Sequence, residues 1–257
     1  MISGLQAQTV TLTPVKDTDV YSYPGNGKPT SSTVSLGVNS TPPGQGVHSQ
    51  RSLIQFNLAS LPYPASEIQS AVLRVFVLPT DPTYGNLSPG NVHVHRQGTN
   101  WGTVTLDAPT WLAFQSAAEL GTFHVPVGSQ ETWQQFDMTG CVIGWVDGSY
   151  ANHGIYLAPE ADVMTTPINV AFASMEVPGY QPQLVITRKP PVLVISSTPT
   201  TVTLQWPVAS STGWTLQRNT NLTSAWTNNT ATLSNVGGNW QLQVPVATRE
   251  FFRLIRN

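Results

Sequence analysis

Two histidines separated by a single residue form the first pattern in this chain that could do chemistry. His93 and His95 lie on either side of Val94, in a stretch whose alternation predicts a strand over residues 92–97. Side chains at i and i+2 share a strand face, so the two imidazoles could bind a metal ion or the hydroxyl groups of a ligand. His124 and His153 are available as further metal ligands, but nothing ties them to the pair. We therefore interpret His93 and His95 as polar residues of an exposed, ligand-binding face rather than as metal ligands.

Carboxylates at the same spacing suggest a second kind of site. Asp17 and Asp19 share one face of a strand, which suits the binding of a cation better than the division of labour between a general acid and a base. Oxygen ligands at strand ends are typical of calcium sites, so we predict one structural calcium ion, with Glu176 as a further ligand. The alternative is that these carboxylates only solvate an edge strand.

Aromatic residues in or beside predicted loops form the third group. A flat ring at a surface can contact the apolar face of a sugar, while amide and imidazole groups bond to its hydroxyls. The alternative is that each ring folds over the edge of the core. The candidates are Tyr84, Trp101, Trp111 and Tyr150.

Familiar catalytic motifs are missing from the sequence. It contains no Gly-x-Ser-x-Gly elbow, no phosphate-binding Walker loop and no Gly-x-Gly-x-x-Gly stretch. Cys141 is the only cysteine, so an intrachain disulfide is excluded, and its apolar neighbours place it in the core. We therefore expect no enzymatic activity.

Composition restricts the partners of the chain. Of its 257 residues only 9% are charged, against about 25% in an average globular protein. The formal net charge of −2 argues against nucleic acid, and no run reaches the roughly 18 apolar residues that membrane insertion needs. Up to Lys189 there are 7 Lys and Arg against 12 Asp and Glu, a net −5, whereas the remainder has 4 against 1, a net +3. These opposite charges could attract each other within one chain or between chains.

The stretch from Arg51 to Val77 predicts the architecture. Ser52–Leu58 alternates as a strand, Ala71–Leu78 is apolar on both faces, and two prolines separate them. We interpret the two strands as opposite walls of a β-sandwich. Met138–Val146 has the apolar spacing of a short helix, which Asp137 or Thr139 could cap. Further predicted elements are a proline-blunted edge strand at Thr9–Val15, a helical turn at Phe114–Leu120, and strands at Thr33–Val38, Thr132–Asp137, Gly154–Ala158, Asn169–Met175 and Gln183–Arg188.

Three segments follow from these patterns. Residues 1–8 are interpreted as the remnant of a signal peptide or a disordered terminus, and residues 9–189 as a first domain. The prolines at 190 and 191 make a stiff linker into residues 190–257, whose short, closely spaced strands predict a small β-sandwich. The predicted fold class is therefore all-β, with a jelly-roll sandwich that contains one short helix, followed by the smaller sandwich.

A set of segments occurs in order over roughly residues 9–188 of the first domain. They are Asp17–Val20, Leu36–Gly37, Arg51–Leu58, Leu61–Pro62, Ser70–Val77, Trp101, Trp111, Trp133–Asp137, Trp145–Val146, Gly154–Leu157 and Pro182–Val185. In these segments the first domain resembles the DNRLRE domain, which is related to the family 96 carbohydrate-binding modules. The segment Gly102–Asp107 departs from the pattern, because the family usually has an acidic, threonine-rich run there. The resemblance implies a jelly roll without catalysis, and it favours a core position for Trp101 and Trp111.

The C-terminal segment has a pattern of its own, formed by Val202–Pro207, Trp214–Gln217, Asn219–Leu222, Trp226–Thr227 and Glu250–Leu254. In these residues it resembles short fibronectin type III-like modules of secreted proteins from Verrucomicrobia and their relatives. The resemblance implies a spacer or surface-attachment element.

These observations lead to two functional hypotheses. The first is a secreted, non-catalytic protein, extracellular or at the cell surface, that binds a polysaccharide or surface glycan through its jelly-roll module. The alternative is a structural subunit of an extracellular filament, surface layer or biofilm matrix, assembled head to tail with copies of itself.

Overall fold

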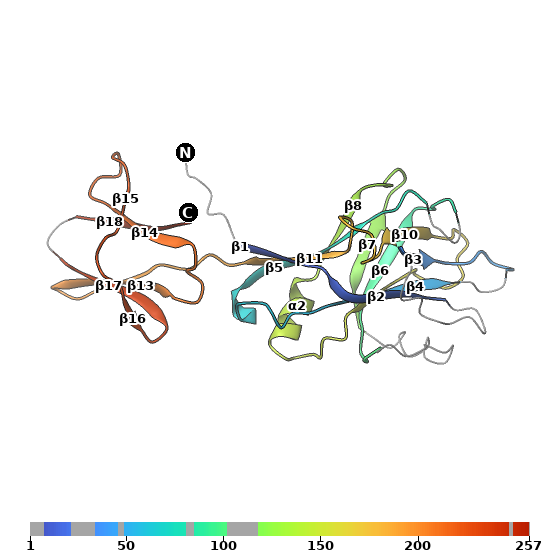
Figure 1. Ribbon diagram of the computed structural model, residues 1–257, viewed down its shortest axis with the longest axis horizontal. Helices are drawn as coiled ribbons and strands as arrows, with labels where there is room; N and C mark the ends of the chain where they lie inside the picture. Colours follow the sequence, from blue (N-terminus) through green and yellow to red (C-terminus); the bar gives the residue numbers. More distant parts are fainter. Residues whose placement is uncertain are drawn as a thin grey trace. The chain divides into compact units, whose positions relative to one another are not determined.

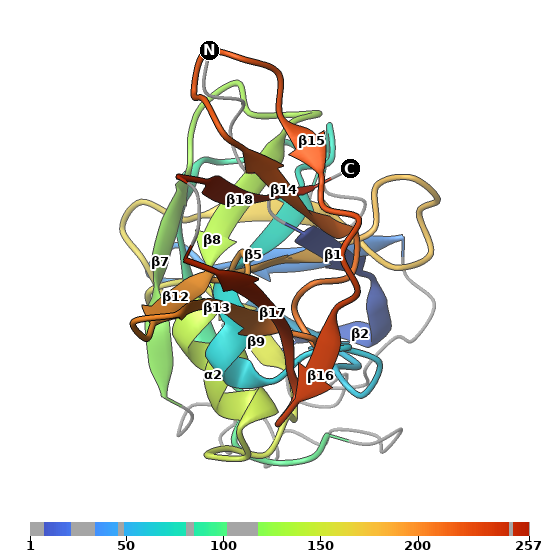
Figure 2. The ribbon, with the colours of Figure 1, turned by 90° about the vertical axis from the view of Figure 1, so that its left-hand side faces the viewer.

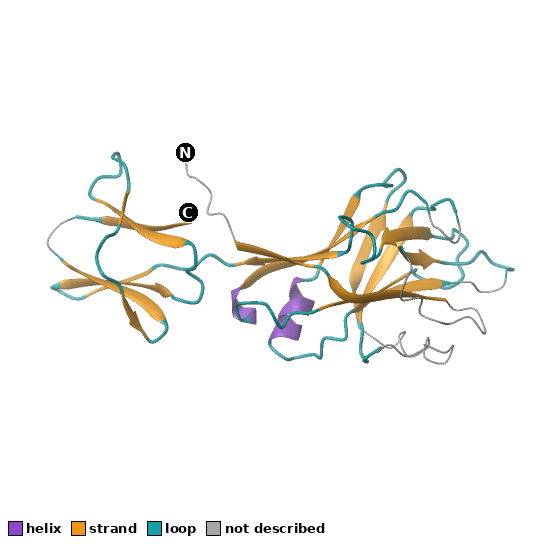
Figure 3. Ribbon diagram, in the orientation of Figure 1, coloured by secondary structure: helices purple, strands orange, loops and turns teal. Residues whose placement is uncertain are grey.

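A computed structural model describes residues 8–21, 34–45, 49–80, 85–101, 118–246 and 249–256. Strands dominate the chain (Figure 3). Within the described residues α2 (Thr139–Val146) is the one α-helix, and the other element drawn as a helix in Figure 3 is a 3-10 turn, so the predicted all-β class with one short helix is confirmed. The described residues from 10 to 186 form one compact unit, and those from 187 onward form a second, together with Gln8 and Thr9.

The strands of the larger unit form two antiparallel sheets (Figure 1), and β1 and β11 each extend two residues beyond its boundaries. The four-stranded sheet has the order β1 (Gln8–Leu12), β11 (Gln183–Arg188), β5 (Ile68–Phe76) and β8 (Trp133–Asp137). The seven-stranded sheet has the order β10 (Asn169–Ala173), β3 (Ser35–Asn39), β4 (Gln50–Phe56), β9 (Ile155–Ala158), β6 (Gly90–Arg96) and β7 (Glu119–Val125), and β2 (Pro14–Tyr21) also pairs with β4.

The apolar side chains of both sheets meet in one core. Ile54 and Phe56 of β4 contribute to it from one sheet, and Leu73 and Val75 of β5 from the other. The predicted pair of walls is therefore confirmed. The connection between them runs through the proline-containing corner and a single 3-10 turn, η1 (Ala65–Glu67).

The N-terminal stretch differs from its prediction. A single edge strand was expected at Thr9–Val15, but the chain forms β1 at the edge of the four-stranded sheet and β2 in the other sheet. Pro14 marks the change, and the pairing of β2 with β4 shifts between Pro14 and Lys16. Because proline cannot donate a ladder hydrogen bond, it suits the point where a strand leaves one sheet and enters the next.

The predicted helix is confirmed over Thr139–Val146. The Asp137 carboxylate accepts hydrogen bonds from the backbone N–H of Thr139 (2.9 Å) and from its hydroxyl (2.5 Å). Cys141, Val142 and Trp145 are buried, and the helix packs against β5 and η1. Gly148, with φ of 82°, follows the helix in the left-handed conformation that glycine favours at such ends.

The segment after Trp101 brings one correction. The predicted turn at Phe114–Leu120 lies partly outside the described residues, but Glu119 and Leu120 belong to strand β7 and not to a helical turn. β7 itself was not predicted. Its pairing with β6 skips Leu120, since Val94 pairs with Gly121 and His95 with Glu119. This bulge breaks the two-residue periodicity by which a strand is recognised in a sequence.

The C-terminal unit has two sheets of its own. One has the order β12 (Val194–Ser197), β13 (Thr201–Pro207), β17 (Asn239–Pro245) and β16 (Ser234–Val236). The other has the order β15 (Thr227–Asn228), β14 (Trp214–Asn219) and β18 (Phe251–Arg256), and Figure 2 shows β13 beside β17 and β14 beside β18. Their small core comprises Leu204, Trp206, Leu216, Leu242 and Leu254.

Candidate functional site

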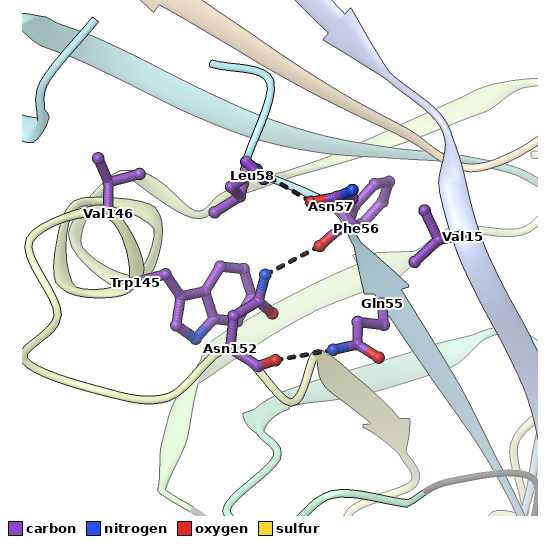
Figure 4. Close-up of a pocket in the computed structure, with 9 residues that line it drawn as sticks. Val15, Gln55, Phe56, Asn57, Leu58, Trp145, Val146 and Asn152 are labelled. Carbon is purple, nitrogen blue, oxygen red and sulfur yellow. Dashed lines mark hydrogen bonds between the residues drawn. The ribbon is translucent and has the colours of Figure 1, made fainter. Parts of the chain in front are cut away.

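A cavity of about 550 Å³ opens where the end of β4 meets helix α2 and the loop before β9 (Figure 4). This volume lies within the range of pockets that hold small ligands. None of the lining residues carries a charge. They are Val15, Gln55, Phe56, Asn57, Leu58, Ala59, Trp145, Val146 and Asn152.

Hydrogen bonds to the backbone fix three amide side chains in this cavity. Gln55 donates from Nε2 to the carbonyl oxygen of Asn152 (2.7 Å), and Asn152 donates from Nδ2 to that of Phe56 (2.8 Å). Asn57 accepts at Oδ1 from the backbone N–H of Ala59 (2.9 Å). These bonds leave Gln55 Oε1 as an acceptor and Asn57 Nδ2 as a donor for a ligand. The amides are held in place before anything binds, which reduces the entropy cost of binding.

Apolar side chains form the rest of the cavity wall. Trp145 and Val146 approach from α2, and Val15 from β2 lies on the opposite side (Figure 4). Trp145 is largely buried at 7% exposure and belongs to the core, as its helical spacing predicted, so only a small part of it lines the cavity. The cavity therefore combines an apolar wall with a few neutral polar groups that are held in fixed orientations.

A second concave surface of about 460 Å³ surrounds Tyr150 and Glu119. Tyr150 is 40% exposed, and the Arg96 guanidinium lies 4.2 Å from the centre of its ring. Glu119 also receives a bond from His93, whose Nδ1 is 2.8 Å from Oε1, and this bond lowers the pKa of Glu119. The structure thus brings three predicted ligand residues, His93, His95 and Tyr150, to the surroundings of one carboxylate. Unlike the first cavity, this groove contains charged groups.

Trp101 is not an exposed ring that a sugar could contact. Only 5% of its surface is exposed, and it packs with Val20, Leu53 and Tyr156 on the outer face of the seven-stranded sheet. Its Nε1 donates to the carbonyl oxygen of His153 (2.6 Å), and Lys16 Nζ lies 4.1 Å from the ring centre. Trp101 therefore covers the sheet. Tyr84 and Trp111 lie outside the described residues.

The predicted calcium ligands lie near one another but are engaged separately. Asp17 accepts at Oδ2 from the backbone N–H of Met175 (2.7 Å), Asp19 accepts from the Gln50 amide, and Glu176 accepts from the Ser174 hydroxyl (2.6 Å). The pKa of Asp17 is raised to about 7, mainly by burial and in smaller part by the charges of Glu176 and Asp19.

These carboxylates do not converge on one point. Within the part of the chain that the structure describes, the only set of three His, Cys, Asp or Glu residues with converging ligand atoms is His93, His95 and Glu119. The arrangement around Asp17 therefore does not match a formed calcium cage, and calcium binding stays a prediction.

Little in the sequence indicates that the amide residues of the first cavity form a site. Gln55, Asn57 and Asn152 are common polar residues, and Asn152 lies about a hundred positions from the other two. The one available signal was Gln55-Phe56-Asn57, where the alternation of β4 ends in two amides. A sequence pattern cannot show that a distant loop closes on this strand end.

The geometry defines a two-sheet β-sandwich with a neutral, amide-lined cavity and a groove with an exposed ring, features that suit the recognition of hydroxyl-rich ligands. A profile of carbohydrate-binding module family 96 matches residues 8–188, so the chain belongs to that family. No curated protein matches the sequence. No helix among the described residues is long and apolar enough to cross a bilayer.

Proposed function

We propose that this protein binds a polysaccharide outside the cell, without catalysing its cleavage, through the cavity between β4 and α2. Membership of a carbohydrate-binding family supports a binding role. The observation that carries the location is the pairing of an apolar wall with pre-oriented amides in a cavity of about 550 Å³.

The two remaining amide groups match the chemistry of a sugar. A hydroxyl group both donates and accepts a hydrogen bond, and the cavity offers the Gln55 Oε1 acceptor and the Asn57 Nδ2 donor. The C–H groups of a sugar ring can pack on Val15, Leu58 and the accessible part of Trp145. Because the lining is neutral, this site favours hydroxyl groups over carboxylate or sulfate groups.

Affinity electrophoresis against a panel of neutral and acidic polysaccharides tests the function. The full chain should be retarded by at least one neutral polymer. Retardation should persist at high salt, because screening weakens charge contacts and leaves neutral hydrogen bonds and apolar contacts intact. No retardation by any polymer, with or without calcium, would refute the carbohydrate-binding proposal.

Variants in the groove at Tyr150 show whether the sugar binds there or in the amide-lined cavity. If the sugar binds in this groove, the exchange Tyr150→Ala should abolish retardation. High salt should then also weaken the retardation of the unmodified chain, because Arg96 is charged. Tyr180→Ala is the matched control, since Tyr180 is 46% exposed elsewhere on the same unit and packs on Phe76. For the amide-lined cavity we expect both tyrosine variants to bind like the unmodified chain.

A further inference from the structure

The outer face of the seven-stranded sheet carries a cluster of metal-binding side chains away from the amide-lined cavity. His93 and His95 point to this face from β6, and Glu119 reaches it from β7 opposite His95. One ligand atom from each of the three residues lies within 4.8 Å of the other two. The sequence alone showed only the histidine pair, because the bulge in β7 hides the third residue.

That bulge determines which side chain of β7 meets the histidines. In regular pairing His95 would lie opposite Leu120, but the register skips Leu120 and pairs His95 with Glu119. Gly121 sits next to the bulge with φ of 145°, a conformation that L side chains rarely adopt. Leu120 packs against the core instead. Bulges of this kind re-aim side chains beside functional sites.

Neighbouring groups hold the cluster in position. His93 Nδ1 lies 2.8 Å from Glu119 Oε1, and the Thr122 hydroxyl donates to the same oxygen at 3.3 Å. The His95 ring stacks on Tyr156, with centroids 4.4 Å apart and planes at 8°. Tyr156 is itself buried, so it provides a fixed surface for His95. At 47% side-chain exposure Glu119 keeps the freedom to adjust.

We propose that His93, His95 and Glu119 bind one divalent transition-metal ion, with Zn²⁺ as the best match. Two imidazole nitrogens and a carboxylate oxygen are an established ligand set for zinc. Bonds of about 2.0–2.1 Å in a tetrahedron place ligand atoms roughly 3.3 Å apart. The present separations, from 2.8 Å to at most 4.8 Å, reach this value through side-chain shifts of about 1.5 Å or less. The fourth position would face solvent.

Calorimetry with ZnCl₂ on the untagged full chain, stripped of metal with a chelator, tests this site without any carbohydrate. We expect one ion per chain. His95→Gln and Glu119→Gln should each weaken binding at least about tenfold, the loss that removal of even an outer-shell partner causes. His124→Gln is the matched control, because His124 lies on β7 like Glu119 but bonds to Asn91 and is not part of the cluster. It should bind zinc like the unmodified chain.

Thermal melts of all three variants without metal establish that they fold. If one of the two ligand variants does not fold, the other is sufficient for the test. The visible spectrum of the Co²⁺-loaded chain adds a direct readout, because four-coordinate cobalt absorbs far more strongly than the hydrated ion. Three results would each overturn the proposal: no zinc binding, unchanged binding in a folded ligand variant, or an equal loss in His124→Gln. None of these results bears on the polysaccharide proposal.

Discussion

At the scale of single residues, Asp17 shows how burial changes the chemistry of a side chain. Its pKa is raised to about 7, chiefly by burial of the carboxyl group and also by the nearby charges of Glu176 and Asp19, while the bond from the N–H of Met175 acts in the opposite direction. In an unfolded chain the pKa is about 3.9. The folded state therefore holds a proton that the unfolded state releases between about pH 4 and pH 7. The stability contributed by this group is complete below pH 4, falls as pH rises, and is lost above pH 7.

Asp17→Asn should make the chain less sensitive to pH. The asparagine oxygen can still accept the bond from Met175, but the side chain no longer ionises. We expect the free energy of unfolding of the variant, relative to the unmodified chain, to rise by roughly 2 kcal/mol from pH 5 to pH 7. Urea titrations in the presence of a chelator measure this. A difference that stays constant from pH 5 to pH 8 would contradict the assignment, and repeating the titrations with calcium tests the predicted ion.

Cys141 provides a second prediction at this scale. Burial on the inner face of α2 raises the pKa of its thiol to about 12, and the thiolate is the reactive form. At pH 8 the native chain should therefore react with a disulfide reagent at least about 100-fold more slowly than the chain in denaturant. Comparable rates in both states would show that the thiol is accessible and that α2 packs less tightly than described.

At the scale of elements, the sequence predicted regular strands well and their interruptions poorly. β4 and α2 follow from clear periodicities and β5 from a continuous apolar run, and β11 begins and ends at the predicted residues, Gln183 and Arg188. β7 was missed because its bulge at Leu120 breaks the alternation, and the same bulge creates the cluster around Glu119. The amide-lined cavity was missed for a related reason, since it forms only when the loop with Asn152 closes on the end of β4.

Alanine substitutions at two glycines test how closely the loop that contains Asn152 approaches β4. Gly154 and Gly179 have the same φ of 86°, so alanine at either site carries the cost of a left-handed conformation, about 1–2 kcal/mol. A Cβ at Gly154 would also lie 2.3 Å from the carbonyl oxygen of Ile54, whereas nothing lies within 4 Å at Gly179. Gly154→Ala should thus cost roughly 1–3 kcal/mol more than Gly179→Ala in chemical denaturation. Equal costs would mean that the loop can move away from β4.

At the scale of the whole molecule, the region that matches the carbohydrate-binding family is followed by a second, smaller unit. The family match ends at residue 188, next to the boundary at residues 186–187 between the two compact units. The likeness of residues 190–257 to fibronectin type III modules, and assembly of the chain into filaments, stay predictions. Val194 and Ile195 are nevertheless more than half exposed on β12, which lies at the edge of its sheet, where another strand could add.

A chain limited to residues 8–189 should keep carbohydrate binding. It contains both sheets of the larger unit and every residue of the amide-lined cavity. We expect its retardation in polysaccharide gels to match that of the full chain, once circular dichroism shows that it is folded. A folded fragment without affinity would place the binding surface in residues 190–257.

Calorimetric titration with an oligosaccharide from the most retarding polymer shows whether sugar binds in the amide-lined cavity. Ala59→Trp fills the cavity without removing any of its amides, and Ala161→Trp is the matched control at another exposed alanine. We expect one sugar site per chain in the unmodified protein and in Ala161→Trp, and no measurable binding in a folded Ala59→Trp variant. Undiminished binding by Ala59→Trp would exclude the amide-lined cavity as the sugar site.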